Sequence, residues 1–401
     1  MASYFEPINL TRDEIEALHS TAPLCDAYRF LDLKVLVHSD DERLLDIFRQ
    51  MYRHFLSTQR WGWNESHSYY ILSRRSDGGV PLLLWDADRA YGLPRGKGLS
   101  DCADIVIFAN ILSKITTHFM IHGAALAAGS GAVVLAGLSG AGKTTLALEL
   151  ARRGLGFFSD EIAAISRTTH DVYPFPRAIG TRERTMELLG TLDFRVGRLH
   201  HTAGGKEKWV VDIEDIFDAP PTTPVPGRYL LLLDTASVEG DTDKDYHYLK
   251  LALKRADTDL IEKLGGIDGV AHGRPEEDGI FYTVGCRVER SRDVQQSFLD
   301  LCREYDEVIL YRVKAVEHPP DARAGPELVP VATMDAGLEL LSNLQNMVAN
   351  DGWLMQEASG KNPRVLFELL DSLAGMACYR LYVGNLTKTA DLVMDLVSAG
   401  K

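Results

Sequence analysis

The sequence predicts an α/β protein with three parts: a core built around a glycine-rich phosphate loop, a smaller N-terminal α+β unit, and a helical C-terminal part. In the middle of the chain, short apolar runs of strand length alternate with segments of helical periodicity. The first hundred residues mix strand and helix patterns, and the apolar spacing after residue 330 is helical. We therefore divide the chain into residues 1–100, 101–330 and 331–401.

In the N-terminal unit, the alternating run 30–37 predicts a strand. Ser39-Asp40-Asp41-Glu42 supplies a cap and first-turn acids for a helix over 44–52. The runs 68–72 and 81–85 predict two further strands, separated by the turn Ser76-Asp77-Gly78-Gly79.

In the core, two apolar runs, 124–128 and 132–136, predict strands joined by Gly129-Ser130-Gly131. A helix is predicted over 144–153 and is closed by Gly154. Further strands are predicted over 156–165, 228–235, 281–285 and 307–313, and surface loops over 220–227, 239–245 and 318–330. Helical periodicity covers 333–350 and 364–377.

The composition is that of an ordinary globular protein, with 401 residues, 45% hydrophobic and 25% charged. The net charge of -14 argues against a dedicated binder of nucleic acid or anionic membranes, because such partners are held by an excess of Lys and Arg. No apolar run has the length of a membrane span, the N-terminus lacks a signal-peptide pattern, and the five cysteines are scattered without a CxxC pair. We expect a soluble, cytoplasmic protein with reduced thiols.

The clearest motif is a phosphate loop with the pattern G-x-x-x-x-G-K-T, between the strand-like run 132–136 and the helix-like run 145–150. Its glycines allow main-chain N–H groups to surround an anion at the positive end of a helix dipole. Lys143 is expected to bridge the β- and γ-phosphates, and the Thr144 hydroxyl to ligate Mg²⁺. A glycine-rich turn that only connects strand to helix is the alternative. The expected nucleotide-binding residues are Gly137, Leu138, Ser139, Gly140, Ala141, Gly142, Lys143, Thr144 and Thr145.

A phosphate loop needs a second carboxylate directed at the metal, and the sequence offers two choices. Asp160-Glu161 follows the apolar run 155–158, soon after the helix of the loop, and such a pair suits one metal ligand and one general base for an attacking hydroxyl. Asp234 ends the run Leu230–Leu233, which is typical of a Walker B strand. Solvent exposure at a strand end is the alternative for Asp160 and Glu161, and an ordinary turn is the alternative for Asp234.

Together these residues resemble the catalytic core of the HPr kinase/phosphorylase family, which is distantly related to ATP-dependent phosphoenolpyruvate carboxykinase. The resemblance rests on His122-Gly123, the phosphate loop, Leu148–Gly154 and Ser159-Asp160-Glu161. It is dense from about residue 120 to 166 and weaker to about residue 390. The segments 173–177 and 378–382 resemble parts of HPr-kinase-related proteins found beside peptide-modification genes.

The resemblance implies a role for each matching residue, with Lys143 joining them in catalysis. His122 matches the active-site histidine of the family, and Asp160 matches the first residue of its Asp-Asp pair, the base toward the acceptor hydroxyl. Glu161 stands at the second, metal-binding Asp. The chain lacks the Glu-x-Arg-Gly-x-Gly loop that accompanies phosphorolysis in the family; Arg177, with Arg182 and Arg184, stands roughly where that loop begins.

We therefore expect an ATP- and Mg²⁺-dependent kinase that phosphorylates a hydroxyl on a peptide, a protein or a small metabolite. Arg177, Lys206 and Lys208 are candidate contacts to substrate or phosphate, and the N-terminal unit is a natural place to bind the acceptor. Two rivals stay open: an ATPase or GTPase switch that uses Asp234, and a non-catalytic nucleotide-sensing module. The sequence does not decide the acceptor, the preference for ATP or GTP, or homo-oligomerisation.

Overall fold

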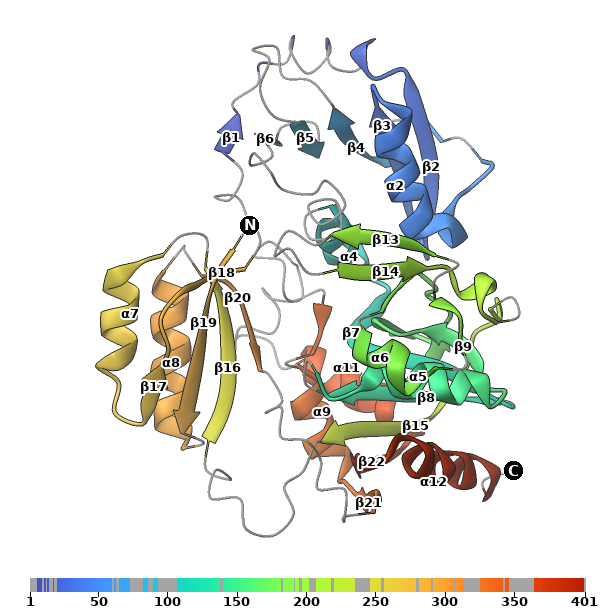
Figure 1. Ribbon diagram of the computed structural model, residues 1–401, viewed down its shortest axis with the longest axis vertical. Helices are drawn as coiled ribbons and strands as arrows, with labels where there is room; N and C mark the ends of the chain where they lie inside the picture. Colours follow the sequence, from blue (N-terminus) through green and yellow to red (C-terminus); the bar gives the residue numbers. More distant parts are fainter. Residues whose placement is uncertain are drawn as a thin grey trace.

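The computed structural model describes residues 6–8, 11, 13, 17, 20–59, 61–62, 65–72, 82–85, 89–92, 107–137, 140–181, 183–190, 192–194, 197–201, 207–217, 220–234, 246–253, 256–278, 281–289, 291–305, 308–313, 325–341, 343–345 and 364–399. Over these residues the chain is a mixed α/β protein with four sheets, which Figure 1 shows as an upper N-terminal unit, a lower core and a sheet on the left. None of the described helices is long and apolar enough to cross a membrane.

The N-terminal unit is a six-stranded sheet in the order β1-β6-β5-β4-β3-β2, with helix α2 packed on it. The predicted helix is confirmed, and Asp41 caps it by accepting a hydrogen bond from Arg43 N–H. The strands predicted over 68–72 and 81–85 are confirmed, and the turn 76–79 lies outside the described residues. The elements are β1 (Glu6–Ile8), β2 (Leu24–Phe30), β3 (Leu33–Ser39), α2 (Glu42–Tyr52), η1 (Arg53–Phe55), β4 (His67–Leu72), β5 (Leu82–Trp85) and β6 (Arg89–Gly92).

The run 30–37 is not one strand, as its alternation predicted, but the end of β2, a tight turn and the start of β3. Phe30 pairs with Leu33 across the turn, and Leu31 has a left-handed backbone with φ 57°. A non-glycine residue at positive φ is uncommon, so the sequence carries no turn signal here. The tertiary pairing of β2 with β3 overrides the local pattern.

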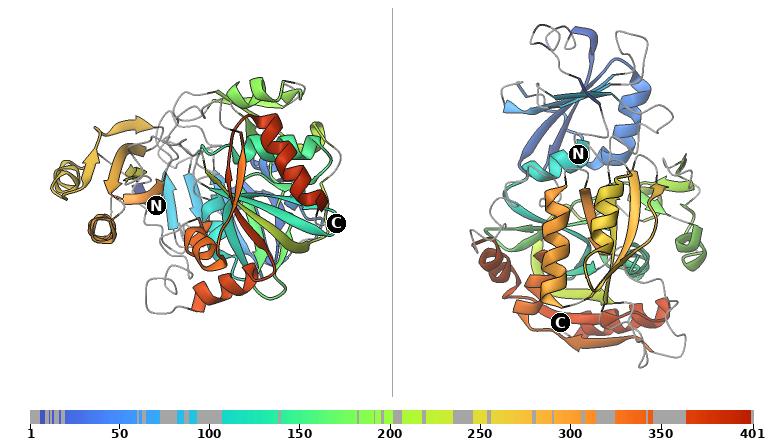
Figure 2. Two further views of the ribbon diagram at one scale, coloured as in Figure 1. Left: turned by 90° about the horizontal axis from the view of Figure 1, so that it is seen from below. Right: turned by 90° about the vertical axis from the view of Figure 1, so that its left-hand side faces the viewer.

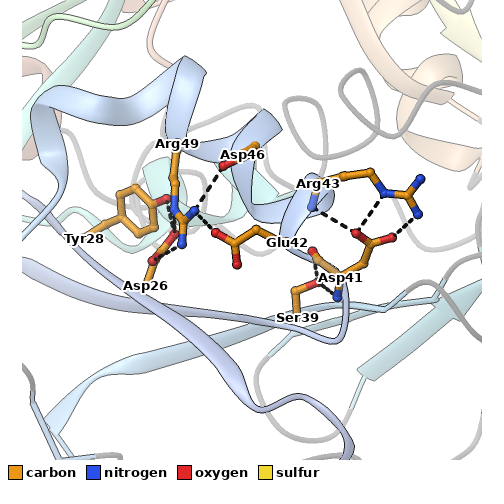
Figure 3. A network of polar contacts seen from close by, with 8 residues as sticks. All are labelled: Asp26, Tyr28, Ser39, Asp41, Glu42, Arg43, Asp46 and Arg49. Carbon is orange, nitrogen blue, oxygen red and sulfur yellow. Dashed lines mark hydrogen bonds and ion pairs between the residues drawn. The ribbon is translucent and has the colours of Figure 1, made fainter.

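Arg49 of α2 ties that helix to the sheet through a group of carboxylates (Figure 3). Its Nη2 donates to Asp26 Oδ1 of β2 at 2.9 Å, and its Nη1 contacts both Glu42 and Asp46 on its own helix. Tyr28 Oη donates to Asp26 Oδ2 at 3.4 Å. Burial, with the nearby Asp26 charge, raises the pKa of Tyr28 far above its usual range, so the phenol stays neutral and donates.

The core is an eight-stranded sheet in the order β11-β10-β7-β8-β15-β22-β21, with β9 also paired to β7. The predicted hairpin is confirmed as β7 and β8, while β8, β15 and β22 run parallel. Helix α5 begins at Lys143, and Gly154 after it has φ 99°, as expected of a residue that closes a helix. The first elements are α4 (Ala109–Lys114), β7 (His118–Ala128), β8 (Gly131–Gly137), α5 (Lys143–Arg152), β9 (Gly156–Ser159), β10 (Ile162–Ser166), β11 (Asp171–Tyr173) and β15 (Val225–Asp234).

The last part of the chain completes the core sheet and is not simply helical. The predicted helix 364–377 ends at Leu373, and residues 377–382 form β22 beside β15. The helix predicted over 333–350 ends at Leu341, and part of the loop predicted over 318–330 is an edge strand. Helices α5 and α12 cover one face of the sheet, and α9 and α11 cover the other (Figure 2, left). These elements are β21 (Glu327–Pro330), α9 (Thr333–Leu341), α11 (Arg364–Leu373), β22 (Ala377–Tyr382) and α12 (Leu386–Ala399).

A small sheet in the order β12-β14-β13 lies where the N-terminal unit meets the core. The joint is held by Asp212, which is 5% exposed and lies 3.0 Å from both Arg53 Nε and His54 Nε2. Phe55 of the N-terminal unit and Phe175 of the core have ring centroids 4.7 Å apart in one shared apolar cluster. The two units are therefore packed together through a common interior. The elements here are β12 (Ile179–Thr181), α6 (Glu183–Leu188), β13 (Arg198–His201), β14 (Glu207–Val211) and η5 (Ile213–Asp215).

Between β15 and β21 the chain forms a separate antiparallel sheet in the order β17-β19-β16-β20, with β18 paired to β19. Two strand–helix–strand units build it, which is the arrangement of a split βαβ, or ferredoxin-like, motif. Helices α7 and α8 share its own apolar core on one face (Figure 2, right). The sequence analysis had placed these residues in one unit with the phosphate loop. The elements are β16 (Tyr246–Leu253), α7 (Thr258–Gly265), β17 (Val270–His272), β18 (Glu276–Asp278), β19 (Phe281–Glu289), α8 (Arg292–Glu304) and β20 (Val308–Val313).

Candidate active site

The glycine-rich loop connects β8 directly to α5. Gly137, Gly140 and Gly142 have φ of 148°, 92° and 88°, the left-handed region that favours glycine. The first hydrogen bond of α5 runs from Leu146 N–H to Gly142 O at 2.9 Å, so the helix itself supplies no acceptor for the amides before Leu146. These N–H groups lie at the positive end of the helix dipole. Leu138 and Ser139 lie outside the described residues.

Lys143 is the first residue of α5, and its side chain is 6% exposed. Its Nζ donates a hydrogen bond to Gly137 O at 2.8 Å, across the opening of the loop. A buried ammonium group needs such acceptors because desolvation of an unpartnered charge is costly. The loop therefore holds its lysine inward, in the position that the motif predicts for a phosphate-binding cation.

Asp160 and Glu161 lie between β9 and β10, at the level of β7 where Gly123 pairs with Ala136, the residue before the phosphate loop. The run 156–165 was predicted as one strand, but Ser159 breaks it, because its Oγ accepts from Ile162 N–H at 3.1 Å. Both β8 and β9 pair antiparallel with β7, so they run parallel on its two sides; β9 ends at Ser159, opposite Ala125, and β10 continues along β7 from Ile162, opposite His122. Asp160 is 6% exposed. The Ser159 side chain thus fixes the main chain at the two acids by accepting from Glu161 N–H and Ile162 N–H.

His122 of β7 lies between this acidic turn and the end of β8. Its Nδ1 is 3.6 Å from Glu161 Oε1, and the next residue, Gly123, donates its N–H to Glu161 O at 3.0 Å. Gly123 also pairs with Ala136, one residue before the loop begins. A Cβ at Gly123 would come within 2.6 Å of Leu135 O, so a glycine is needed for this close approach. The structure therefore brings His122 and Glu161 together, as the sequence predicted.

Asp234 lies on the opposite side of the loop strand. It ends β15, whose Leu233 pairs with Gly137, and its Oδ2 is 3.4 Å from Arg380 Nη1 of β22. Neighbouring strands are about 4.8 Å apart, so Asp234 is about one strand spacing from the loop strand and the Asp160–Glu161 turn about two. Both candidate acids thus flank the phosphate loop, and the ambiguity of the sequence persists in the fold.

The other predicted residues lie in different surroundings. Ala141 is buried, and Thr145 Oγ1 lies 3.2 Å from Thr185 Oγ1 of α6. Arg177 is 6% exposed, with its guanidinium 5.0 Å from the Phe108 ring centroid and 5.6 Å from that of Tyr52.

Arg177 therefore belongs to the joint with the N-terminal unit. Lys206 lies outside the described residues, and Lys208 pairs with His200 in the β13–β14 hairpin. The loop predicted over 239–245 lies outside the described residues.

Three residues that contact Asp234, His122 or one another near the phosphate loop were not candidates from the sequence. They are Arg380, Glu339 and Asn343. Arg380 contacts Asp234 and also donates to Glu339 Oε2 of α9 at 2.7 Å. Asn343, after α9, accepts a hydrogen bond from His122 N–H at 2.7 Å through its main-chain oxygen. An arginine inside the apolar strand pattern 377–382 was the available signal, because a charge in a core strand requires a partner.

No protein-family model matches the chain, and a search of curated proteins finds no match. Within the part of the chain that the structure describes, no group of three or more His, Cys, Asp or Glu side chains gathers as a metal centre.

Proposed function

We propose that this chain is an ATP- and Mg²⁺-dependent kinase that transfers a terminal phosphoryl group to a hydroxyl, on a core of the HPr kinase/phosphoenolpyruvate carboxykinase type. One observation carries the proposal: a strand–loop–helix cradle with left-handed glycines and an inward lysine follows β8 beside the level of β7 that carries the His122–Glu161 pair. The cradle supports triphosphate binding, because its amides and helix dipole favour anions. The acidic turn supports metal-assisted transfer to a hydroxyl.

The residues present fit a magnesium nucleotide. Mg²⁺ is normally held by one or two carboxylates together with phosphate oxygens and water, which agrees with a site that has few protein ligands. In the proposed site Thr144 and Glu161 hold the metal, which supplies charge neutralisation on the phosphates. The amides at the start of α5 and Lys143 bind the phosphates, and His122 orients Glu161.

Asp160 is the proposed general base. Its carboxylate accepts the proton of the acceptor hydroxyl as the hydroxyl oxygen bonds to the γ-phosphorus, while the bond from that phosphorus to the β–γ bridging oxygen breaks and a nucleoside diphosphate leaves. Asp160 is buried beside Ser159, in a turn whose main chain is fixed. A fixed base close to the loop edge suits this role. The acceptor is a serine or threonine of a peptide or protein, or a small hydroxylated metabolite.

The decisive experiment compares Asp160→Asn with Asp234→Asn in transfer of label from γ-labelled ATP to candidate peptide and metabolite acceptors. Loss of a general base costs about 10²–10⁴ in rate, so Asp160→Asn should reduce transfer by that factor while nucleotide binding persists. Asp171→Asn is the control, because Asp171 pairs with Pro226 near the start of β15, at the opposite end of the strand from Asp234. The kinase assignment fails if only Asp234→Asn abolishes transfer.

A second candidate is a nucleotide-hydrolysing switch that uses Asp234 as the Walker B acid. It is favoured by one observation: β15 is the direct parallel neighbour of β8, and Asp234 stands at the loop edge. This candidate predicts acceptor-independent release of phosphate that Asp234→Asn abolishes and Asp160→Asn leaves intact. Tight nucleotide binding with neither transfer nor hydrolysis in the unmodified protein indicates a sensing module instead.

A further inference from the structure

The turn after α9 occupies the position beside β7 that β8 leaves when the phosphate loop begins. The pairing of β7 with β8 covers Gly123–Ala128. At His122 and Ile121 of β7, the turn replaces β8 as the pairing partner. His122 N–H donates to Asn343 O at 2.7 Å, and Ile121 forms a β-bridge with Leu344. Leu344 is 1% exposed. The turn is therefore fixed against β7 at His122, the histidine of the candidate site.

The same helix is also tied to the opposite flank. Arg380 Nη2 donates to Glu339 Oε2 at 2.7 Å, and Arg380 Nη1 lies 3.4 Å from Asp234 Oδ2. Burial lowers the pKa of Arg380, but hydrogen bonding to Glu339 and the nearby carboxylates raise it overall, so the guanidinium stays charged. One helical turn further on, Asn343 Nδ2 donates to Glu339 O at 3.2 Å. Glu339 thus links Arg380 to the turn.

A continuous series of contacts follows: Asp234 to Arg380, Arg380 to Glu339, Glu339 to Asn343, Asn343 to His122, and His122 to Glu161. It joins the two acidic flanks of the phosphate loop.

Helix α9 is too well packed to move independently of its layer. Ala336 and Leu340 are 0% exposed. At Gly337 an added Cβ would come within 2.6 Å of Leu370 of α11, so the two helices are in close contact. Figure 2 shows this layer on the face of the core sheet opposite α5 and α12. A packed helix that contacts both flanks transmits a shift of one flank to the other, because packed cores do not deform continuously.

We propose that α9 (Thr333–Leu341) and the turn residues 343–345 form a positioning element that couples nucleotide binding to the relative placement of Asp234 and Glu161, and that Arg380 of β22 is the positioning residue that contacts it. The inference rests on the nucleotide site of the proposed function. A ligand that fixes both carboxylates stabilises the turn, and by linkage, loss of the turn contacts weakens the ligand by the same factor.

A matched control exists on the same face of the sheet. Arg167, directly after β10, pairs with Glu368 of α11, the same chemistry on the neighbouring helix. On β10, Ile162 pairs with His122 and Ser166 with His118, so Arg167 lies five residues, or roughly 17 Å, beyond the His122 level. Arg167→Met therefore removes an ion pair between a strand and a helix that is of the same kind but lies far from Asp234 and Glu161.

The test is hydrogen exchange of the full chain with Mg²⁺ and a non-hydrolysable ATP analogue. In the unmodified protein the analogue should slow exchange about fivefold or more at the start of α5, at 118–124 and at 343–345, since couplings between sites are commonly about 5–150-fold. In Arg380→Met and Glu339→Gln, protection at α5 should persist at saturating analogue, and protection at 343–345 should fall below about twofold. The affinity for the analogue should fall by about the factor by which protection at 343–345 is reduced. Arg380→Lys should restore part of both effects, and Arg167→Met should match the unmodified protein.

The possible results distinguish a failure of the coupling from a failure of the proposed nucleotide site. Protection at α5 without protection at 343–345 in the unmodified protein overturns the coupling and leaves nucleotide binding in place. Full protection at 343–345 in both Arg380→Met and Glu339→Gln overturns it equally. Absence of protection at α5 removes the nucleotide site and the inference with it. If Arg380→Met has lost slow exchange in α12 without ligand, it is misfolded, and Glu339→Gln decides.

Discussion

Gly142 and Gly154 stand at the two ends of α5 and offer a matched test of the phosphate loop. Their φ angles are 88° and 99°, and no atom lies within 4 Å of a Cβ added at either position. Gly142→Ala and Gly154→Ala therefore introduce the same backbone strain without a clash. That strain is about 1–2 kcal/mol for a left-handed L-residue. Each change should lower the melting temperature by about 2–8 °C, given about 2–4 °C per kcal/mol for a domain of ordinary size.

The two variants should differ in nucleotide binding alone. Alanine at 142 relieves its strain by leaving the left-handed conformation, which turns the neighbouring amides away from the cradle. A hydrogen bond to a charged group contributes about 1.5–3 kcal/mol, so loss of two such bonds weakens binding by at least about a hundredfold. Gly154 lies at the far end of the helix, where no phosphate contact is proposed. Titration with a fluorescent ATP analogue and Mg²⁺ measures both affinities, and scanning calorimetry measures both stabilities.

The reasoning is refuted if Gly142→Ala binds the analogue as tightly as Gly154→Ala. It is refuted as well if both lose binding equally, because the effect then follows the strain rather than the loop. Gly137→Ala gives a third reference, since its Cβ would come within 2.6 Å of Leu233 O and should unfold the loop strand.

Two further predictions concern stability and reactivity. Burial alone would raise the pKa of Asp212, but the hydrogen bonds and charges of His54, Glu214 and Arg53 hold that pKa below its usual value. The stability that Asp212 contributes to the folded state is therefore present above the ordinary carboxyl pKa. That stability is lost as the pH falls through the lowered pKa of the folded state. Asp212→Asn should lower the urea midpoint at neutral pH, and the difference from the unmodified protein should shrink below about pH 4; a constant difference down to pH 2 contradicts this. Iodoacetamide should modify exposed Cys25 in the folded chain well before Cys286, because burial raises the pKa of the Cys286 thiol to about 12. Mass mapping of timed samples decides, and equal rates at the two thiols would count against the packing of the β16–β20 sheet.

Local chemistry predicted the elements whose signals lie within a few residues. Asp41 is the N-cap that predicts the start of α2, Gly154 predicts the end of α5, and Gly129-Ser130 predicts the hairpin turn between β7 and β8. The phosphate loop belongs to this group, since left-handed glycines and a lysine at a helix start are sequential features. The family resemblance named His122 and Glu161 as separate site residues, and the fold places His122 Nδ1 3.6 Å from Glu161 Oε1.

The failures have two causes: breaks in a strand that no glycine marks, and pairing between strands that are distant in the chain. The turn at Leu31 has no glycine to signal it, and the break at Ser159 depends on a side chain that caps its own turn. The helix predicted over 364–377 ends at Leu373, and residues 377–382 form β22, which pairs in parallel with the distant β15. The separate sheet of 246–313 likewise depends on strands that are distant in the chain.

By itself the sequence determined that a strand, a glycine-rich loop and a helix follow one another, because sterics at glycine act within a single turn of chain. Only the tertiary structure decided where the acids lie, because strand order brings Asp234 to one side of β8 and Glu161 to the other. It alone revealed that α9 and the turn after it contact both sides, since Asn343 lies more than 200 residues from His122 and Arg380 lies 146 residues from Asp234. Such contacts arise from burial of whole helix and sheet faces, which no local pattern encodes.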